Sequence, residues 1–246
     1  MTLRSHFSRS LRDYFGVLNS RGRVNVQECR ESGAAHGKDH RMTEPMDTLR
    51  SEFGEIDIYL FDQLHRGRIA SGMRVLDAGC GGGRNLVYLL RQGFDVRGVD
   101  ADPKAVDTTR HLAHPMFPDA DARFVVAPVE SIPFADASFD VVISSAVLHF
   151  ASDEAQWHAM LREMWRVLAP GGVFFARLAT TVGHESRVKP LGNRRFIMPD
   201  GDERFLVDED FVMNAVKDLG GTLLDPLKTS VVHGMRSMMT WVMRRP

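Results

Sequence analysis

A glycine cluster between a short apolar segment and a helix-forming segment most constrains the fold of this chain. The run Val75–Asn85 reads VLDAGCGGGRN. Glycine adopts positive φ without strain and carries no Cβ atom, so a ligand can lie directly against its backbone. A strand that leads through such a loop into a helix predicts a parallel sheet with a ligand site at the end of its first strand.

The segments on both sides of the cluster alternate between strand-like and helix-like patterns. Phe53, Ile56 and Leu60 belong to a helical stripe that ends near Gly67 and predicts a lead-in helix before the first strand. The core strands are expected at 74–76, 95–99, 123–127, 139–145 and 173–178, and the core helices at 85–91, 103–113 and 154–168. Such alternation predicts parallel strands covered by helices on both faces.

The last third of the chain departs from this alternation. We interpret 180–206 as an irregular excursion, followed by a helix at 208–219 and strands at 222–227 and 235–244. The connection between the last two strands is too short for a crossover, so an antiparallel pair at the sheet edge is expected. The predicted fold is therefore α/β: a Rossmann-like, seven-stranded, mostly parallel sheet with helices on both faces and an antiparallel last strand.

Residues 1–45 differ in composition from the rest of the chain. They hold seven arginines and few large apolar residues at a regular spacing, so burial cannot offset the entropy of ordering them. We predict a disordered tail at 1–45 and a single domain at 46–246. The alternatives for the tail are an extension from an upstream start codon, a targeting segment and a partner-binding arm.

Charge and cysteine content narrow the partners and the compartment. The formal net charge of −1 gives no overall field to hold a nucleic acid or an anionic membrane surface. Two cysteines cannot form a disulfide framework, and no apolar run approaches the roughly 20 residues that span a bilayer. We therefore expect a cytoplasmic protein without nucleic-acid or membrane partners, as a monomer or homodimer.

The spacing of the glycines separates two classes of nucleotide cofactor. Dinucleotide sites use GxGxxG, but here the third glycine position is occupied by Arg84. Asp77, two residues before Gly79, would repel a pyrophosphate and favours a cationic ligand. S-adenosylmethionine fits better because it carries a sulfonium and an ammonium group. An NAD-dependent oxidoreductase is the weaker interpretation.

A second acid ends the next predicted strand. Asp100 can accept hydrogen bonds from both hydroxyls of a ribose, a role that dinucleotide-binding folds share. Asp100 alone therefore indicates a bound ribose and does not choose between the cofactors. Asp102, directly before Pro103, is interpreted as a helix cap rather than as a ligand.

The motifs from about residue 55 to 245 follow an order that resembles the class I S-adenosylmethionine-dependent methyltransferases, in their small-molecule branch. Val75–Gly83 resembles the first motif of that family, Asp100 its ribose-binding acid, and Pro128–Phe134 the segment that encloses adenine. Residues 138–142 resemble the strand that leads to the acceptor, and 166–172 the turn after the crossover helix. The resemblance implies methyl transfer to a small-molecule acceptor. The cofactor contacts it implies are Asp77, Gly79, Gly81, Arg84, Asn85, Asp100, Ala101, Val129, Glu130 and Ser145.

Pro128 departs from the pattern of the family. Many relatives have an acid at this position, where it receives the amino group of adenine, and proline cannot do so. We expect main-chain groups around Val129 and the side chain of Glu130 to recognise adenine instead. Ile132 and Phe134 still supply an apolar wall.

Two residues are candidates for a role in the reaction itself. His149 follows the strand that leads to the acceptor, and an ordinary imidazole pKa suits a general base; a structural histidine is the alternative. Arg177 lies in an otherwise apolar strand and needs an acid partner or an anionic substrate, because an unpaired buried guanidinium is costly.

The excursion at 180–206 has a basic excess. It suggests an anionic acceptor, and mutual ion pairs on a solvated surface are the alternative interpretation. The charged or titratable side chains concerned are His184, Arg187, Lys189, Arg194, Arg195, Asp200, Asp202, Glu203 and Arg204.

One alternative to methyl transfer stays open, and metal chemistry is not expected. A non-catalytic S-adenosylmethionine-binding sensor or scaffold would keep the glycine loop without turnover. The sequence shows no His/Cys/Asp cluster at metal-ligand spacing, so no metal is expected.

Overall fold

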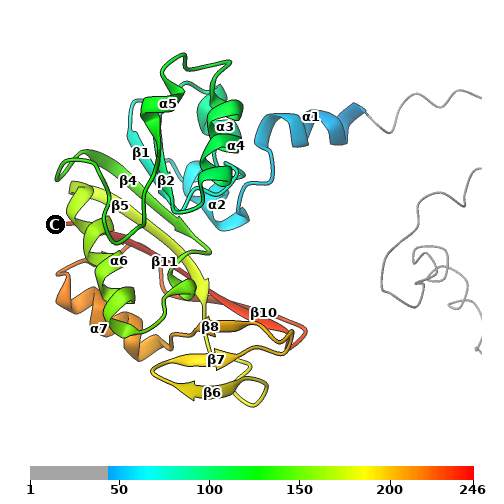
Figure 1. The fold of residues 1–246 in the computed structure, drawn as a ribbon, viewed down its shortest axis with the longest axis vertical. Coiled ribbons are helices and arrows are strands. Elements are labelled where there is room, and N and C mark those ends of the chain that lie inside the picture. The colour runs from blue at the N-terminus through cyan, green and yellow to red at the C-terminus, as the bar shows by residue number, and fades with distance from the viewer. Residues whose placement is uncertain (1–43) are drawn as a thin grey trace, which may run out of the picture. The chain divides into compact units, whose positions relative to one another are not determined.

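The sheet is organised around strand β1 (Arg74–Ala78), which lies parallel between β2 (Asp95–Asp100) and β4 (Phe139–Ser145). The computed structural model describes residues 44–246, which form one compact unit (Figure 1). The strand order is β10-β11-β5-β4-β1-β2-β3, and β9 pairs with β11 beside this path. The tail predicted at 1–45 lies outside the described residues apart from its last two positions.

Most of the predicted elements are present with small changes in their ends. The helices are α1 (Glu44–Phe53), α2 (Ile58–His65), α3 (Val87–Arg91), α4 (Pro103–Ala113), α5 (Ala120–Arg123), α6 (Glu154–Val167) and α7 (Glu209–Asp218), with a 3₁₀ turn η1 (Leu148–Phe150). The remaining strands are β3 (Phe124–Val126), β5 (Leu168–Ala179), β6 (Lys189–Gly192), β7 (Arg195–Ile197), β8 (Glu203–Phe205), β9 (Thr222–Leu223), β10 (Lys228–Val232) and β11 (Arg236–Arg244).

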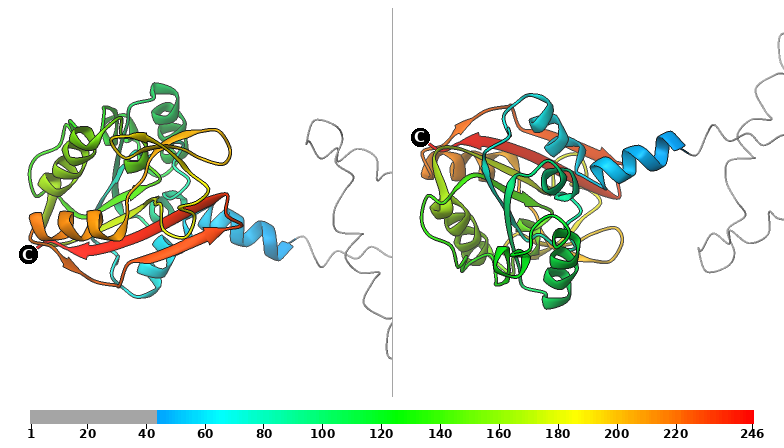
Figure 2. Two further views of the ribbon diagram at one scale, coloured as in Figure 1. Left: turned by 90° about the horizontal axis from the view of Figure 1, so that it is seen from below. Right: turned by 90° about the horizontal axis from the view of Figure 1, so that it is seen from above.

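Each face of the sheet is covered by its own apolar core. Val141 and Ile143 of β4 point to the core shared with α2, α3, α4 and α5, whereas Val142 points to the core shared with α6 and α7. Figures 1 and 2 show these helix groups on opposite sides of the strands. Burial on both faces explains why the middle of β4, Val141–Ile143, is a continuous apolar run rather than an alternating one.

The sheet ends in an antiparallel pair, as predicted, but with a different strand arrangement. β11 runs antiparallel to β5 on one side and to β10 on the other. The prediction placed a strand at 222–227 and missed β10 at 228–232; within that predicted range only Thr222 and Leu223 form a strand. The α/β fold with a mostly parallel sheet and an antiparallel last strand is confirmed. With β9, the sheet of the described chain has eight strands.

Two other expectations are corrected by the structure. The excursion at 180–206 is not irregular, because β6, β7 and β8 form a small antiparallel sheet beyond the carboxyl end of β5 (Figure 1). The single lead-in helix is divided into α1 and α2. Gly54 adopts φ +63° between them, and the Asp57 side chain accepts a hydrogen bond from the amide of Tyr59 to begin α2.

A nearly buried carboxylate attaches α2 and the residues after it to the last part of the chain. Asp225 accepts hydrogen bonds from Arg68 Nη1 at 2.6 Å and from Gln63 Nε2 at 3.3 Å, and Arg66 Nη1 lies 3.4 Å away. Burial by itself would raise the pKa of Asp225, but the hydrogen bonds and the charges of Arg68 and Lys228 hold its pKa below the ordinary value. The charged form is therefore the one that the fold stabilises.

Replacing Asp225 by alanine should lower the free energy of unfolding by roughly 1.5–3 kcal/mol, the range for a hydrogen bond to a charged group. Arg68 would lose its acid partner. Because the pKa of Asp225 is lowered on folding, this contribution should be present above about pH 4 and fade as the pH falls through the lower, folded value. Urea unfolding at pH 7 and pH 3 measures both effects.

The matched control is Asp218→Ala, which removes an exposed carboxylate at the end of α7. Its effect should stay within about 0.5 kcal/mol. Equal stability of the two variants at pH 7 would contradict a stabilising role for the Asp225 contacts.

Candidate functional site

The glycine loop after β1 is held against β2 by its own backbone. The amides of Gly79 and Cys80 both donate to the carbonyl of Val99, at 2.8 and 3.0 Å. Gly79 adopts φ +84°, and a Cβ atom there would lie 2.4 Å from Cγ2 of Val147. Gly81 adopts φ +52° and faces open space. Only glycine fits the first position, and the second leaves bare backbone for a ligand.

Asp100 lies beside this loop and fixes its shape. One carboxylate oxygen accepts from the amide of Gly81 at 2.8 Å, and the other accepts from the amide of Asp102 at 2.9 Å. Each oxygen keeps a lone pair, so two more donors can be accepted. Asp102 caps α4 through the amide of Lys104 at 3.0 Å, which agrees with its predicted role as a cap.

Asp77 is buried beneath the loop without a partner. Its side chain is 1% exposed, and neither carboxyl oxygen has a hydrogen-bond partner. Burial raises the pKa of Asp77 to about 8; the charge of Arg84 opposes this rise and that of Asp100 adds to it. A buried carboxyl group without a partner is costly, and a cationic group nearby would remove that cost. The loop therefore suits a ligand with a positive charge.

A cavity of about 300 Å³ opens between the glycine loop, Asp100 and the segment after β3. The predicted contacts that line it are Gly79, Asp100, Ala101, Val129 and Glu130. Pro128, the first residue of the segment expected to enclose adenine, also lines it, as do four residues that no sequence motif indicated: Val147, Phe150, Gln156 and Met160. Phe150, Gln156 and Met160 come from η1 and α6, and a helical stripe alone does not reveal that its edge borders a cavity.

The comparisons with known proteins agree with this geometry. Residues 76–176 match the family described as "Methyltransferase domain". An uncharacterised methyltransferase of Synechocystis is 39% identical over 106 residues, which are 43% of this chain and 47% of that protein. A ubiquinone biosynthesis O-methyltransferase of Maricaulis maris is 30% identical over 166 residues, 65% of this chain and 63% of that protein. These matches support a class I S-adenosylmethionine-dependent methyltransferase. The matches span less than two thirds of these two relatives.

A solved structure extends the likeness over most of the chain. The 1,6-didemethyltoxoflavin-N1-methyltransferase of Burkholderia thailandensis, with 1,6-didemethyltoxoflavin and S-adenosylhomocysteine bound, has a TM-score of 0.58. The match covers 87% of this chain and 92% of that structure at 18% identity. At that identity the likeness shows the methyltransferase fold alone.

Five of the predicted cofactor contacts do not line the cavity: Asp77 and Gly81, which were described above, and Arg84, Asn85 and Ser145. Arg84 Nη2 donates to Ser145 Oγ at 3.0 Å, which joins the glycine loop to the end of β4. Asn85 is buried, and its Oδ1 accepts from the amide of Asp57 at 3.0 Å. Asn85 thereby positions the start of α2. Cofactor contacts by all five residues stay predictions.

Arg177 has the acid partner that its burial requires. Its Nη1 lies 2.6 Å from Oδ2 of Asp57, whose side chain is fully buried. The guanidinium also lies over the ring of Tyr59, 5.2 Å from its centre. Its Nε is buried without a partner. The ion pair explains the burial of Arg177 without a substrate, and it connects the amino end of α2 to β5 at the edge where β4 ends.

The neutral imidazole of His149 accepts a hydrogen bond within the fold. The imidazole is 6% exposed, and its Nδ1 accepts from the amide of Ala179 at 3.2 Å. In the neutral ring the proton must then lie on Nε2, so the ring presents no free lone pair. Burial, with a smaller effect of the charge of Arg204, lowers the pKa of His149 to about 4. This arrangement supports the structural alternative and gives no support to a general base.

The arginines of the small sheet pair mostly with acids of the same region. Arg194 contacts Asp208 at 2.8 Å and Arg195 contacts Glu203 at 2.9 Å. Arg204 likewise pairs with Asp202. These contacts favour the interpretation of mutual ion pairs.

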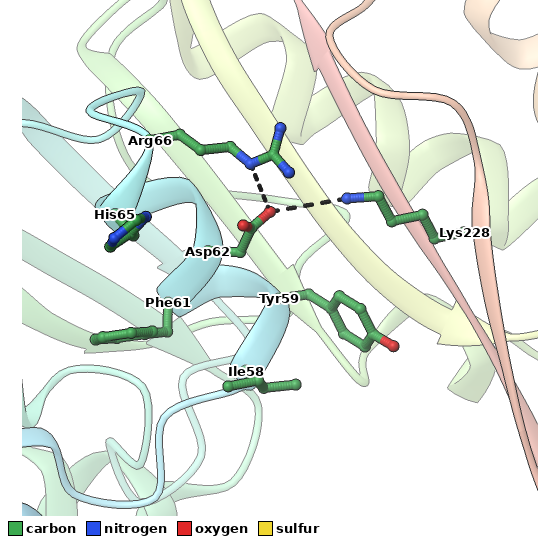
Figure 3. Close-up of a pocket in the computed structure, with 7 residues that line it drawn as sticks. All are labelled: Ile58, Tyr59, Phe61, Asp62, His65, Arg66 and Lys228. Carbon is green, nitrogen blue, oxygen red and sulfur yellow. Dashed lines mark ion pairs between the residues drawn. The ribbon is translucent and has the colours of Figure 1, made fainter.

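A second hollow, of about 360 Å³, lies on α2 (Figure 3). The residues that line it are Ile58, Tyr59, Phe61, Asp62, His65, Arg66 and Lys228. Asp62 lies between the two cations, 2.8 Å from Arg66 Nε and 3.7 Å from Lys228 Nζ. This pairing offsets the positive charge of the hollow, which shares no residue with the cavity beside the glycine loop.

The described residues offer neither a metal site nor a membrane-spanning helix. Among residues 44–246, no group of three or more His, Cys, Asp or Glu side chains is placed to hold a metal ion. In the same range no helix combines the length and apolar character needed to cross a membrane.

His149→Asn should reduce the loss of stability at acidic pH. The asparagine Oδ1 can accept from the amide of Ala179 but cannot be protonated. In the wild-type protein the folded pKa of about 4 lies below the unfolded value of 6.5, so stability should fall as the pH drops from about 6.5 to 4. Between pH 7.5 and 4.5 the wild-type protein should lose roughly 2 kcal/mol more than the variant.

The measurement is urea unfolding of both proteins at the two pH values. The same loss in both would mean that His149 titrates normally in the folded state. In that case a base near neutral pH would again be possible.

Proposed function

We propose that this chain binds S-adenosylmethionine and transfers its methyl group to a small-molecule acceptor, with release of S-adenosylhomocysteine. The observation that carries the proposal is Asp77, a buried carboxyl group without a partner beneath a loop of bare glycine backbone. The ammonium group of the cofactor would supply the missing partner. Asp100 lies beside the same loop with lone pairs to spare for ribose hydroxyls.

The donor set of the cavity fits the remaining parts of this cofactor. Val129, Phe150 and Met160 offer apolar surface for a flat base, and Phe150 stays 59% exposed beside the opening. The segment 128–132 is held by hydrogen bonds at both ends, from the amide of Ser131 to the carbonyl of Pro128 and from the amide of Ile132 to Glu163. A wall held in this way can orient a ligand without reorganising.

The chemistry requires little from the protein besides alignment. When bound, S-adenosylmethionine supplies a methyl carbon activated by a sulfonium, so the acceptor forms a bond to carbon as the carbon–sulfur bond breaks in line. The chain has to hold the two reactants in that line and exclude water, a contribution of about 7–11 kcal/mol when the geometry is good. Neither His149 nor Arg177 has to transfer a proton in this scheme, which agrees with the fixed hydrogen bond of the first and the ion pair of the second.

We propose the class of acceptor from the names of the relatives and from the ion pairs of the arginines near the carboxyl ends of β4 and β5. The names of the Maricaulis maris and Burkholderia thailandensis proteins indicate ubiquinone biosynthesis and a toxoflavin precursor, respectively. An anionic acceptor gains no support from Arg177, Arg194 or Arg195, because each already pairs with an acid.

Calorimetry should detect S-adenosylmethionine and S-adenosylhomocysteine at micromolar dissociation constants and should not detect NAD. Because Asp77 has a raised pKa and an ammonium partner favours its charged form, binding should release a proton. The affinity for S-adenosylhomocysteine should rise roughly tenfold from pH 6 to pH 7.5, below the range where the α-amino group of the ligand itself titrates. Heats in two buffers of different ionisation enthalpy measure that proton.

Asp77→Asn tests the assignment directly. It should weaken binding at least about tenfold and remove the proton release, whereas Asp107→Asn, an exposed acid on α4, should change neither. Tight binding without proton release in the wild-type protein would mean that Asp77 does not face the ammonium group. Absence of binding altogether would contradict the proposed function.

Turnover separates an enzyme from a non-catalytic sensor or scaffold. A panel of phenol, amine, thiol and heterocyclic acceptors should include compounds that raise S-adenosylhomocysteine release at least about tenfold above the acceptor-free rate. Gly79→Ala, which introduces a clash with Val147, should abolish this release by disturbing the loop. Cofactor binding with no release across the panel would favour the sensor.

A further inference from the structure

The start of α2 rests directly on the segment that follows the glycine loop. The amide of Asp57 donates to Oδ1 of Asn85 at 3.0 Å, and both residues are buried. Three residues earlier, Gly54 packs so closely that a Cβ atom there would lie 2.7 Å from Cγ2 of Val87. Because Asn85 and Val87 come directly after the loop, a shift of the loop should also move the start of α2.

Asp57 is the residue at which this segment meets the sheet. Its side chain is fully buried, and its two oxygens serve different elements. Oδ1 accepts from the amide of Tyr59 at 2.9 Å and begins α2, whereas Oδ2 accepts from Nη1 of Arg177 in β5 at 2.6 Å. The same guanidinium lies over the ring of Tyr59. One carboxylate therefore fixes both the amino end of α2 and a charged side chain of β5.

A second contact joins the glycine loop to the same place from the side of the sheet. Arg84 Nη2 donates to Ser145 Oγ at 3.0 Å, and Ser145 is the partner of Arg177 in the register of β4 and β5. Arg84 and Asn85 are neighbours in the chain, so these contacts close into a ring. We call the five residues of this ring, Arg84, Asn85, Asp57, Arg177 and Ser145, the polar ring.

We propose that Asp57 is a positioning residue that makes the placement of α2 depend on the cofactor. This inference rests on the proposed function, because S-adenosylmethionine is the ligand that would fix the loop. With the loop fixed, Asn85 holds the amide of Asp57, and Asp57 holds Arg177 and the start of α2. Since β4 is the strand expected to lead to the acceptor, the acceptor side is complete only after the cofactor has bound. Such coupling is reciprocal, so an acceptor that orders α2 also tightens the binding of the cofactor.

The other end of α2 is attached independently of the glycine loop. Asp225 accepts from Gln63 near that end, and neither residue belongs to the polar ring. When the polar ring loosens, the first turn of α2 should therefore open while the last turn stays attached. Two amides report on the first turn, because that of Tyr59 donates to Oδ1 of Asp57 and that of Phe61 donates to the Asp57 carbonyl.

Hydrogen exchange in α2, measured with and without saturating S-adenosylhomocysteine, tests this coupling. In the wild-type protein the compound should slow exchange in the first turn at least about fivefold, the lower end of the usual range for coupled sites. Exchange in α7, which packs against the other face of the sheet, should not change. Calorimetry on the same proteins establishes the concentration that saturates each of them.

Asp57→Asn breaks the link at its centre. The oxygen of the new amide can still cap α2, but its NH₂ group would face the guanidinium of Arg177, which also only donates. The ratio of exchange rates without and with S-adenosylhomocysteine should fall below about twofold, although the compound still binds. A merely structural role for Asp57 would raise both rates by the same factor and leave their ratio unchanged.

Asn85→Ser cuts the link from the side of the loop and keeps the Asp57–Arg177 pair. The serine hydroxyl is too short to reach the amide of Asp57, so the ratio should fall in the same way, and this variant tests the coupling if Asp57→Asn does not fold. The control is Asp62→Asn, which removes an acid from the same helix outside the polar ring. It should keep the wild-type ratio.

A wild-type ratio in either variant that folds would overturn this inference while the proposed function stands. Binding of S-adenosylhomocysteine to the wild-type protein with no change of exchange in α2 would overturn it as well. If the wild-type protein did not bind the compound, the proposed function itself would fail.

Discussion

The parallel alignment of β1 between β2 and β4 is the constraint on which the rest of the site depends. Parallel neighbours bring their carboxyl ends to one edge, so the chain leaves β1, β2 and β4 beside each other. The amides of Gly79 and Cys80 then hydrogen-bond to Val99 and hold the loop in the turn between two strands. Without this register, Asp77, Asp100 and Ser145 would have no reason to share an edge.

Local patterns were sufficient to predict the part of the site that is built from strand ends. The glycine run and Asp100 each lie within a few residues of the strand that positions them, and the structure places Gly79, Asp100 and Glu130 around one cavity. Contacts between distant segments could not be predicted in this way. Asp57 and Arg177 are separated by 120 positions, and the sequence indicates only that Arg177 needs some partner.

The same limit explains the errors at the end of the chain. A two-residue strand such as β9 gives almost no periodic signal, and the apolar run of β10 is too short to separate from the connection around it. β6 is exposed along its length, β7 is partly buried and β8 changes from exposed at Glu203 to buried at Phe205, so these short strands lack the continuous apolar pattern that marks a core strand. Their pairing with one another, which a single sequence does not reveal, sets their positions together with the burial of Phe205.

Two buried titratable groups show how a partner decides whether burial indicates function. His149 and Asp77 are both shielded from water, and both favour the neutral form. For His149 the neutral ring is satisfied by the amide of Ala179, so burial and hydrogen bonding agree and nothing further is required. For Asp77 no protein group satisfies either oxygen, so burial imposes a cost that the fold alone does not offset. We therefore propose that a ligand supplies the missing charge at Asp77, so that Asp77 rather than His149 is the centre of the proposed site.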